Sequence, residues 1–297
     1  MHQRDDTLII ERSGGIVTVT FNKPERKNAI DSRMLGRLLE MLNEVRRRPG
    51  DRVLVVTGAQ GDFSSGADVV DPSGLAGLAV KAKGSPGSVS QVFTSRGSAG
   101  EPEPEPEPEP EAMPHALHGL RQLGEAVLAL HRLPIPTIAK VDGVAAGAGL
   151  SVALCCDLVV ASERARFIEI FPKRGLSTDG GSSWLLPRLV GIQKAKELTF
   201  FGDVVSADQA SAIGLVNRVV SAEELDDAVA EWARRLASGP TLALSMTKSL
   251  LNSAFSFSFE EMVEHEVRAQ AINFASHDTV EAIAAFIDRR EPHFTGN

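Results

Sequence analysis

Two short glycine-rich segments contain the residues best suited to chemistry in this sequence. One is FSSGAD at residues 63–68 and the other is AGAG at residues 146–149, and each follows a predicted short strand. Small residues let a ligand approach the backbone closely, so two such loops could aim N–H donors at one oxygen atom. Donors fixed in advance around a developing oxyanion contribute about 3 to 4 kcal/mol each. The alternative is that each loop only allows a helix to pack closely on a strand.

Other common kinds of site are not indicated. Residues 147–149 lack the third glycine of the dinucleotide-binding fingerprint, and the sequence contains no Gly-Lys-Ser/Thr phosphate-binding loop. Cys155 and Cys156 are adjacent in an apolar stretch, where they offer neither a disulfide framework nor a metal-ligand spacing. We therefore expect no metal site and interpret both cysteines as core residues.

An α/β core is predicted to position the two loops. Apolar residues on both sides of a turn at residues 13–15 predict a hairpin of residues 8–11 and 16–21. Asp31 precedes a periodic apolar segment and predicts a capped helix. Short apolar runs predict strands at residues 53–57, 137–141 and 158–161, and helical periodicity predicts helices from residue 113 to before Pro134 and at residues 150–156.

The sequence after residue 181 is predicted to be almost entirely helical. The expected helices are residues 184–190, 194–201, 207–214, 222–237, 242–254, 259–275 and 279–289. Strands early and helices late favour an α/β core that carries a helical C-terminal region. We place the core in residues 1–200 and the helical region in residues 201–297.

Residues 71–112 are predicted to be a flexible insert in this core. Of the 30 residues from 71 to 100, 14 are Gly, Ser or Pro, and an alternating Glu-Pro run follows to residue 111. Gly/Ser-rich chain is flexible, whereas charge repulsion and the restricted φ of proline extend a Glu-Pro run. A passive linker is the simplest interpretation, with a docking arm as the alternative.

Charge argues against nucleic-acid and membrane partners. The net charge is -8, but six acids lie in the Glu-Pro run, and without them it is -2. A nearly neutral body lacks the basic stripe that binds nucleic acid or anionic lipid. The N-terminus does not resemble an export or transit signal, and the longest mostly apolar stretch, residues 144–161, is interrupted by Ser151 and Asp157. We expect a cytoplasmic protein.

Four motifs, in this order, resemble those of the crotonase (enoyl-CoA hydratase/isomerase) superfamily. They are NKPERKNA at residues 22–29, GDFSSGAD at 61–68, the segment 141–157 that begins VDGVAAGAG and ends at Asp157, and the segment 175–191 that begins GLSTDGG. The resemblance covers nearly the whole chain apart from the insert. It implies a spiral of ββα units with a C-terminal helical trimerisation region, assembled as a homotrimer or a homohexamer.

The resemblance also implies a site for an acyl-CoA thioester. The backbone N–H groups of Ala67 and Ala148 would form the oxyanion hole on the thioester carbonyl, which favours an enolate. The expected substrate and CoA contacts are Arg26, Ala29, Gly66, Asp68, Gly147, Phe171, Phe286 and Arg289, the last two sometimes acting from a neighbouring subunit. Val70 stands where hydratases often have a CoA-contacting lysine. Coenzyme A would enter as part of the substrate, and no metal or redox cofactor is required.

The acid and base residues point to isomerisation rather than hydration. The motifs place Ser151 and Phe171 at the positions of the two catalytic glutamates of the hydratases. Hydration needs a carboxylate pair to deprotonate water and to return a proton, and neither Ser nor Phe does this. Asp179 matches the aspartate of family members that isomerise dienoyl-CoA or ring-epoxide CoA thioesters, and WLLPR at residues 184–188 resembles the phenylacetate-pathway isomerases.

Several alternatives stay open at this level. Asp179 could cap a helix that starts near Gly180. Glu169 could turn inward and replace a missing glutamate, which would restore hydration. Asp179 also matches the nucleophile of aroyl-CoA dehalogenases, although Gly124 stands where they have a helper histidine. Thioester or C–C hydrolysis, and an acyl-CoA binder without catalysis, are further possibilities. The leading hypothesis is an acyl-CoA isomerase that moves a proton with Asp179.

Overall fold

The computed structural model describes residues 7–68 and 112–296. The predicted insert lies outside the described residues except for residue 112, and Val70 also lies outside them. No helix in the described parts of the chain is long and apolar enough to cross a membrane.

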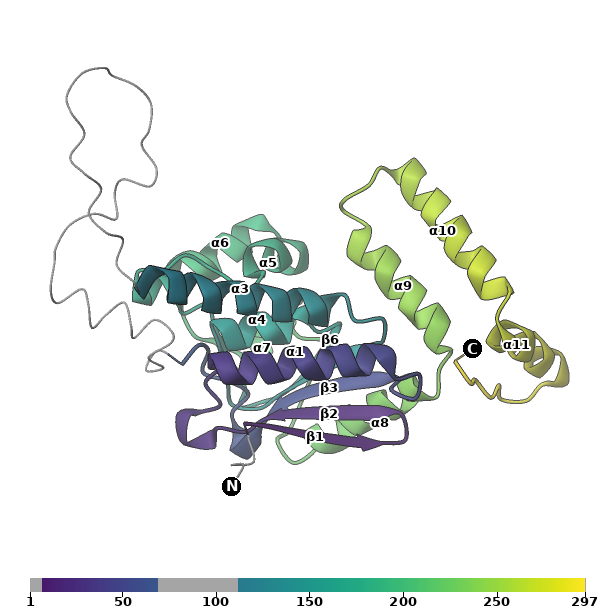
Figure 1. The fold of residues 1–297 in the computed structure, drawn as a ribbon, viewed down its shortest axis with the longest axis horizontal. Helices are drawn as coiled ribbons and strands as arrows, with labels where there is room; N and C mark the ends of the chain where they lie inside the picture. Colours follow the sequence, from purple (N-terminus) through teal and green to yellow (C-terminus); the bar gives the residue numbers. More distant parts are fainter. Residues whose placement is uncertain (1–6, 69–111, 297) are drawn as a thin grey trace, which may run out of the picture.

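Within these residues, six strands form the main sheet (Figure 1). Their order is β1 (Leu8–Ser13), β2 (Ile16–Phe21), β3 (Val53–Gly58), β4 (Thr137–Val141), β6 (Leu158–Ser162) and β9 (Arg218–Val220). Only β1 and β2 pair antiparallel, and the other neighbours are parallel. The predicted hairpin is confirmed: its two-residue turn, Gly14 and Gly15, has positive φ at both positions, which glycine adopts without strain.

Three shorter strands form a second sheet that the sequence did not predict. They are β5 (Val144–Ala146), β7 (Arg166–Ile168) and β8 (Val205–Ser206). The prediction that the chain after residue 181 is almost entirely helical is therefore wrong for β8 and β9. Strands of two or three residues are too short to show an alternating pattern, so only their pairing partners define them.

Helices cover both faces of the main sheet. Leu54 and Val56 of β3 pack in the core cluster that contains residues of α1 (Ser32–Arg47), α3 (Ala112–His131) and α4 (Ala148–Cys155). Val53 and Val55 point to the other face, where they pack on α8 (Leu225–Ala237). A strand buried on both faces explains why this segment is a continuous apolar run.

The remaining helices fall into two groups. The helices α5 (Ser182–Val190), α6 (Ile192–Phe201) and α7 (Ala207–Ala212) belong to the main body, whereas α9 (Thr241–Ser253), α10 (Phe259–Phe274) and α11 (His277–Asp288) stand to one side of it (Figure 1). Both β9 and α8 lie beyond residue 200, the predicted end of the core. However, β9 is a strand of the main sheet, and α8 packs on one face of that sheet. The chain therefore leaves the body after α8 rather than at residue 200.

Candidate active site

The two glycine-rich loops lie side by side. The Ser64 N–H donates to the Val144 carbonyl at 2.8 Å, and the Ala146 N–H donates back to the Ser64 carbonyl at 2.9 Å. Gly66 has a φ of 101°, and a Cβ atom there would lie 2.8 Å from the Ala146 oxygen and 3.6 Å from the Ala148 nitrogen. Only glycine fits this approach, so the loop after β3 is held against the start of α4.

This contact brings two unused N–H donors together. Among the described residues, the N–H groups of Ala67 and Ala148 donate to no other protein group. Ala148 is the first residue of α4, and the first N–H groups of a helix have no partner within the helix. Both alanines line one cavity of about 390 Å³.

Asp179 lines the same cavity. It lies in the turn between the short helix η3 (Phe171–Arg174) and α5. Its Oδ1 atom is buried and has no hydrogen-bond partner among the described residues, and burial raises the pKa of the carboxyl group to about 6. The hypothesis that Asp179 caps a helix is wrong, because α5 begins at Ser182 after Gly181 and has no side-chain cap.

Six further predicted contacts line this cavity, namely Arg26, Ala29, Gly66, Asp68, Gly147 and Phe171. The structure adds four residues that sequence reasoning missed, namely Ser65, Ile170, Arg174 and Leu176. Ile170 and Arg174 are neighbours of Phe171 on the segment that carries η3, and no motif distinguishes them. Apolar walls with a few convergent polar groups are typical of small-molecule sites.

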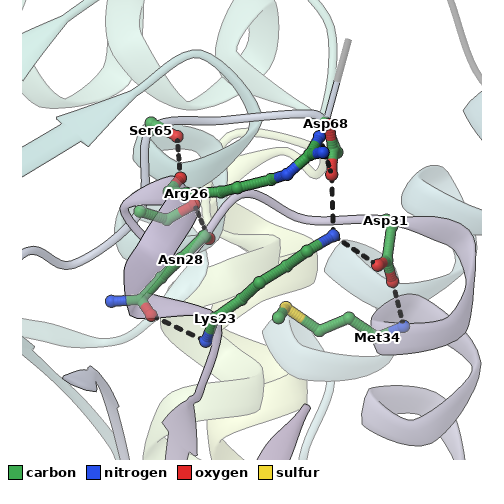
Figure 2. A network of polar contacts seen from close by, with 8 residues as sticks. Lys23, Arg26, Asn28, Asp31, Met34, Ser65 and Asp68 are labelled. Carbon is green, nitrogen blue, oxygen red and sulfur yellow. Dashed lines mark hydrogen bonds and ion pairs between the residues drawn. The ribbon is translucent and has the colours of Figure 1, made fainter. Parts of the chain in front are cut away.

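Asp68 is held by a network of charges at the edge of the cavity. Its carboxylate accepts from Lys23 Nζ at 2.7 Å and from an Arg26 guanidinium nitrogen at 2.9 Å (Figure 2). Lys23 also donates to Asp31 at 2.8 Å, and Asp31 caps α1 by accepting from the Met34 N–H, as the sequence predicted. Burial lowers the pKa of Lys23, but the two carboxylates outweigh it and raise the pKa overall. The network ties the loop that carries Ala67 to the start of α1.

Comparisons with known proteins identify the family. A sequence profile described as enoyl-CoA hydratase/isomerase matches residues 11–81 and 118–297. The chain belongs to the enoyl-CoA hydratase/isomerase family. It is 35% identical over 289 residues to 1,2-epoxyphenylacetyl-CoA isomerase of Escherichia coli K12, with 95% of each chain covered. It is 30% identical over 291 residues to a Rhodobacter capsulatus protein assigned as an enoyl-CoA hydratase, with 98% of each covered.

A solved structure gives the same result for the fold. A Streptomyces coelicolor A3(2) protein assigned as an enoyl-CoA hydratase superposes with a TM-score of 0.83 at 33% identity. The match covers 98% of this chain and 94% of that one. The chain therefore has the crotonase fold, as its four motifs predicted.

Phe286 and Arg289 are not brought to the cavity of this family member. Phe286 lies on α11 and Arg289 directly after it, both are exposed, and neither lines the cavity. The physical reason is that α11 lies with α9 and α10 to one side of the body (Figure 1). Within one chain, the C-terminal contacts predicted for CoA are therefore absent from the described residues that line this site.

Ser151, which the motif resemblance places where hydratases have a glutamate, is closely packed by neighbouring polar groups. Its Oγ lies 3.2 Å from the carbonyl oxygens of Gly147 and Asp179 and 3.0 Å from Ser182 Oγ. A Cβ atom on Gly180 would lie only 2.6 Å from the Ser151 Cβ. The turn that carries Asp179 thus occupies the space that a larger side chain at residue 151 would need.

Glu169 does turn inward, as one alternative required, but it does not line the cavity. Its side chain is 2% exposed, and Thr178 Oγ1 donates to its Oε2 at 3.3 Å. Burial raises the pKa of Glu169 to about 7; the hydroxyls of Ser182 and Thr178 oppose this rise and the charge of Asp179 adds to it. Glu169 therefore lies against the turn that carries Asp179 and behind the lining of the cavity.

A larger cavity of about 860 Å³ lies between α3, α5 and α9. It contains none of the predicted site residues, and its Cys155 thiol is inert because burial raises the pKa to about 12. Among the described residues, no group of three or more His, Cys, Asp or Glu could hold a metal ion. The smaller cavity, which combines two free N–H donors with a perturbed carboxyl, is the better candidate for catalysis.

Proposed function

We propose that this protein is an acyl-CoA isomerase. The thioester carbonyl accepts hydrogen bonds from the Ala67 and Ala148 N–H groups, and Asp179 moves a proton between two carbons of the acyl group. The observation that carries the proposal is that one cavity contains two N–H donors and a buried carboxyl oxygen that have no hydrogen-bond partner in the part of the chain that the structure describes.

The two parts of the site act on the same intermediate. Hydrogen bonds to the thioester oxygen stabilise the negative charge that develops when an adjacent C–H bond is broken. The Asp179 carboxylate takes that proton, the electron pair enters the enolate, and the double bond re-forms at another position. Asp179 then returns the proton at a different carbon, so the product is an isomer and no atom is gained or lost.

Geometry favours this reaction over hydration. Hydration requires a second carboxylate to activate water, whereas Ser151 and Phe171 replace the two glutamates of hydratases and Glu169 does not line the cavity. The E. coli relative is named for an isomerisation, although other relatives are named as hydratases. Asp179 alone is sufficient for a proton shift because one carboxylate can act first as base and then as acid.

Mass spectrometry in heavy water tests the proposal. The protein is incubated with 2-enoyl-, 3-enoyl-, 3,5-dienoyl- and phenylacetate-derived CoA thioesters. We expect a product with a shifted double bond and no added water, and we expect Asp179→Asn to abolish it. The product gains deuterium wherever the proton held on Asp179 exchanges with heavy water before it is returned. Added water would instead indicate a hydratase, and thioester binding without turnover across the panel would indicate a binder.

A further inference from the structure

Glu169 is a buried carboxyl group that the proposed proton transfer does not use. It follows β7 and is 2% exposed. Its Oε1 has no hydrogen-bond partner of ordinary geometry among the described residues, and its Oε2 accepts from Thr178. An unpaired charge in such a place is costly, which favours the protonated form.

Glu169 contacts the turn that carries Asp179. Thr178, whose hydroxyl binds Glu169, directly precedes Asp179 in the chain. On the other side of Asp179, the Ser182 N–H donates to the Asp179 carbonyl at 3.1 Å, and the Ser182 hydroxyl pairs with Ser151. Ser151 in turn contacts the carbonyl oxygen of Gly147, next to the Ala148 donor. The polar groups behind Asp179 thus connect both halves of the site.

We infer that Glu169 is a positioning residue of the proposed isomerase, a neutral carboxyl group that holds the 178–179 turn so that the ionised Asp179 faces the substrate. The inference rests on the proposed function. Glu169 touches neither the substrate nor the reacting atoms in this arrangement, because it lies outside the cavity lining.

The order of ionisation supports this role. Burial raises the pKa of both carboxyl groups, and the charge of Asp179 raises the pKa of Glu169 further, which favours a neutral Glu169 beside an ionised Asp179. Among the described residues, Asp179 is the charged group that shifts the pKa of Glu169. The other polar neighbours of Glu169 are the uncharged Thr178 and Ser182. Two adjacent carboxylates repel each other, so the ionisation of one delays that of the second. Loss of the Glu169 proton at higher pH would place a second negative charge behind Asp179 and displace the turn.

The first test needs no substrate. Infrared difference spectra of the full-length protein, recorded near neutral pH, report the C=O band of a protonated carboxyl group. We expect Glu169→Gln to lose this band and Asp179→Asn to retain it. A band that disappears in Asp179→Asn but persists in Glu169→Gln would place the proton on Asp179 and overturn the inference.

The second test compares kinetics on the thioester that the wild type converts best. We expect Glu169→Ala to lower kcat by about 10- to 100-fold, because a small misplacement of a catalytic group has effects of this size, while KM changes less than about threefold. We expect wild-type activity to fall above neutral pH, and Glu169→Gln should keep kcat within about threefold and lack this fall, because its amide does not ionise. Glu163→Gln, which changes an exposed glutamate, is the control and should match the wild type.

Two results separate the possible failures. Wild-type kinetics in Glu169→Ala would overturn the positioning role, and so would an alkaline fall that persists in Glu169→Gln. Full turnover in Asp179→Asn would overturn the proposed function itself, whatever the spectra of the Glu169 variants show. Circular dichroism and thermal unfolding of Glu169→Ala distinguish a displaced turn from a failure to fold, and Glu169→Gln retains the shape of the side chain if the alanine variant is unstable.

Discussion

At the residue scale, the chemistry of Asp179 depends on its surroundings more than on its identity. Asp157, another aspartate in the family motifs, is paired with Lys248 at 2.8 Å and also accepts from the Thr137 N–H, so it has a structural role. Asp179 has no such partner among the described residues, and burial raises its pKa. A base with a pKa near neutrality can both accept and return a proton, which is what an isomerisation requires.

The pH dependence of turnover should follow the ionisation of Asp179. With a pKa of about 6, the carboxylate is the dominant form above that pH and is lost as the pH falls below it. We expect kcat/KM to drop about tenfold per pH unit on the acidic side. Steady-state rates measured across this range check the prediction, and a flat acidic limb would contradict it.

Asp179 should also reduce the stability of the fold. Its folded pKa is raised above the unfolded value of 3.8, so the folded state binds more protons between these two values and loses stability as the pH rises through about 6. We expect Asp179→Asn to raise the free energy of unfolding by about 1 to 3 kcal/mol at neutral pH, with little gain below pH 3.8. Denaturant unfolding at several pH values measures this, and an equal gain at every pH would argue against a charge effect.

The ion pairs of Asp68 should affect turnover, because they anchor the loop that carries Ala67. Asp68→Asn weakens the attraction to Lys23 and Arg26, and the loop that carries the Ala67 donor then loses its anchor. We expect kcat to fall by about 10- to 100-fold, because displaced oxyanion donors cost catalysis directly. The control is Glu197→Gln, which breaks an exposed pair with Lys194 and should leave both rate and stability almost unchanged. Equal kcat values in the two variants would contradict the anchoring role.

At the element scale, the site is formed where the loop after β3 of the main sheet is hydrogen-bonded to β5 of the second sheet. Ala67 lies in the loop after β3 and Ala148 begins α4 directly after β5, and the two segments pair at Ser64. The two segments approach so closely that each of them requires a glycine. Gly66, in the loop after β3, has a positive φ, and Gly149, in α4, lies directly against Ser64. Because these segments are closely packed, one added methyl group should strongly affect both the stability and the geometry of the site.

Gly149→Ala should therefore damage both stability and activity. A Cβ atom at residue 149 would lie 2.6 Å from the Ser64 Cβ and 2.7 Å from the Ser64 carbonyl oxygen. We expect a loss of about 1 to 3 kcal/mol from overpacking, and a fall in kcat because α4 shifts away from the loop. Gly124→Ala in α3 is the matched control: a Cβ there has nothing within 4 Å, and alanine should stabilise the helix by up to about 1 kcal/mol. Thermal unfolding and turnover of both variants check the prediction.

At the scale of the whole molecule, the C-terminal helices expose large apolar side chains. Phe259, Phe274 and Phe286 are 79%, 71% and 85% exposed, and Ile287 is 72% exposed. Exposed apolar surface of this extent is typical of an interface. It agrees with the expectation of a homotrimer or homohexamer, in which a neighbouring subunit would also supply the predicted CoA contacts Phe286 and Arg289.

Introducing charge on this surface should weaken the assembly. We expect the double variant Phe286→Asp and Ile287→Asp to shift the protein from trimer or hexamer toward monomer, and to raise KM for the thioester. Asn43→Asp, which places a carboxylate on the exposed side of α1, is the control and should keep the wild-type mass. Light scattering coupled to gel filtration measures the mass, and an unchanged mass in the double variant would count against an interface on α11.

The sequence by itself determined the elements that have long periodic patterns and the local chemistry of their ends. The Gly14-Gly15 hairpin, the Asp31 cap of α1 and the apolar run of β3 were all predicted, because each depends on residues that are neighbours in the chain. The two glycine loops were found for the same reason. These features account for most of the sheet and for the motifs that carry the family resemblance.

The tertiary structure alone decided which groups face each other. The short strands β5, β7, β8 and β9 exist through their partners, and Glu169 was brought behind Asp179 by the chain between β7 and α5. The start of α5 after Gly181 excluded a capping role for Asp179, and the position of α11 kept Phe286 out of the cavity. The burial of a carboxyl group depends on contacts between segments that are distant in the sequence, and burial in turn shifts its pKa. No local sequence pattern can therefore predict that pKa.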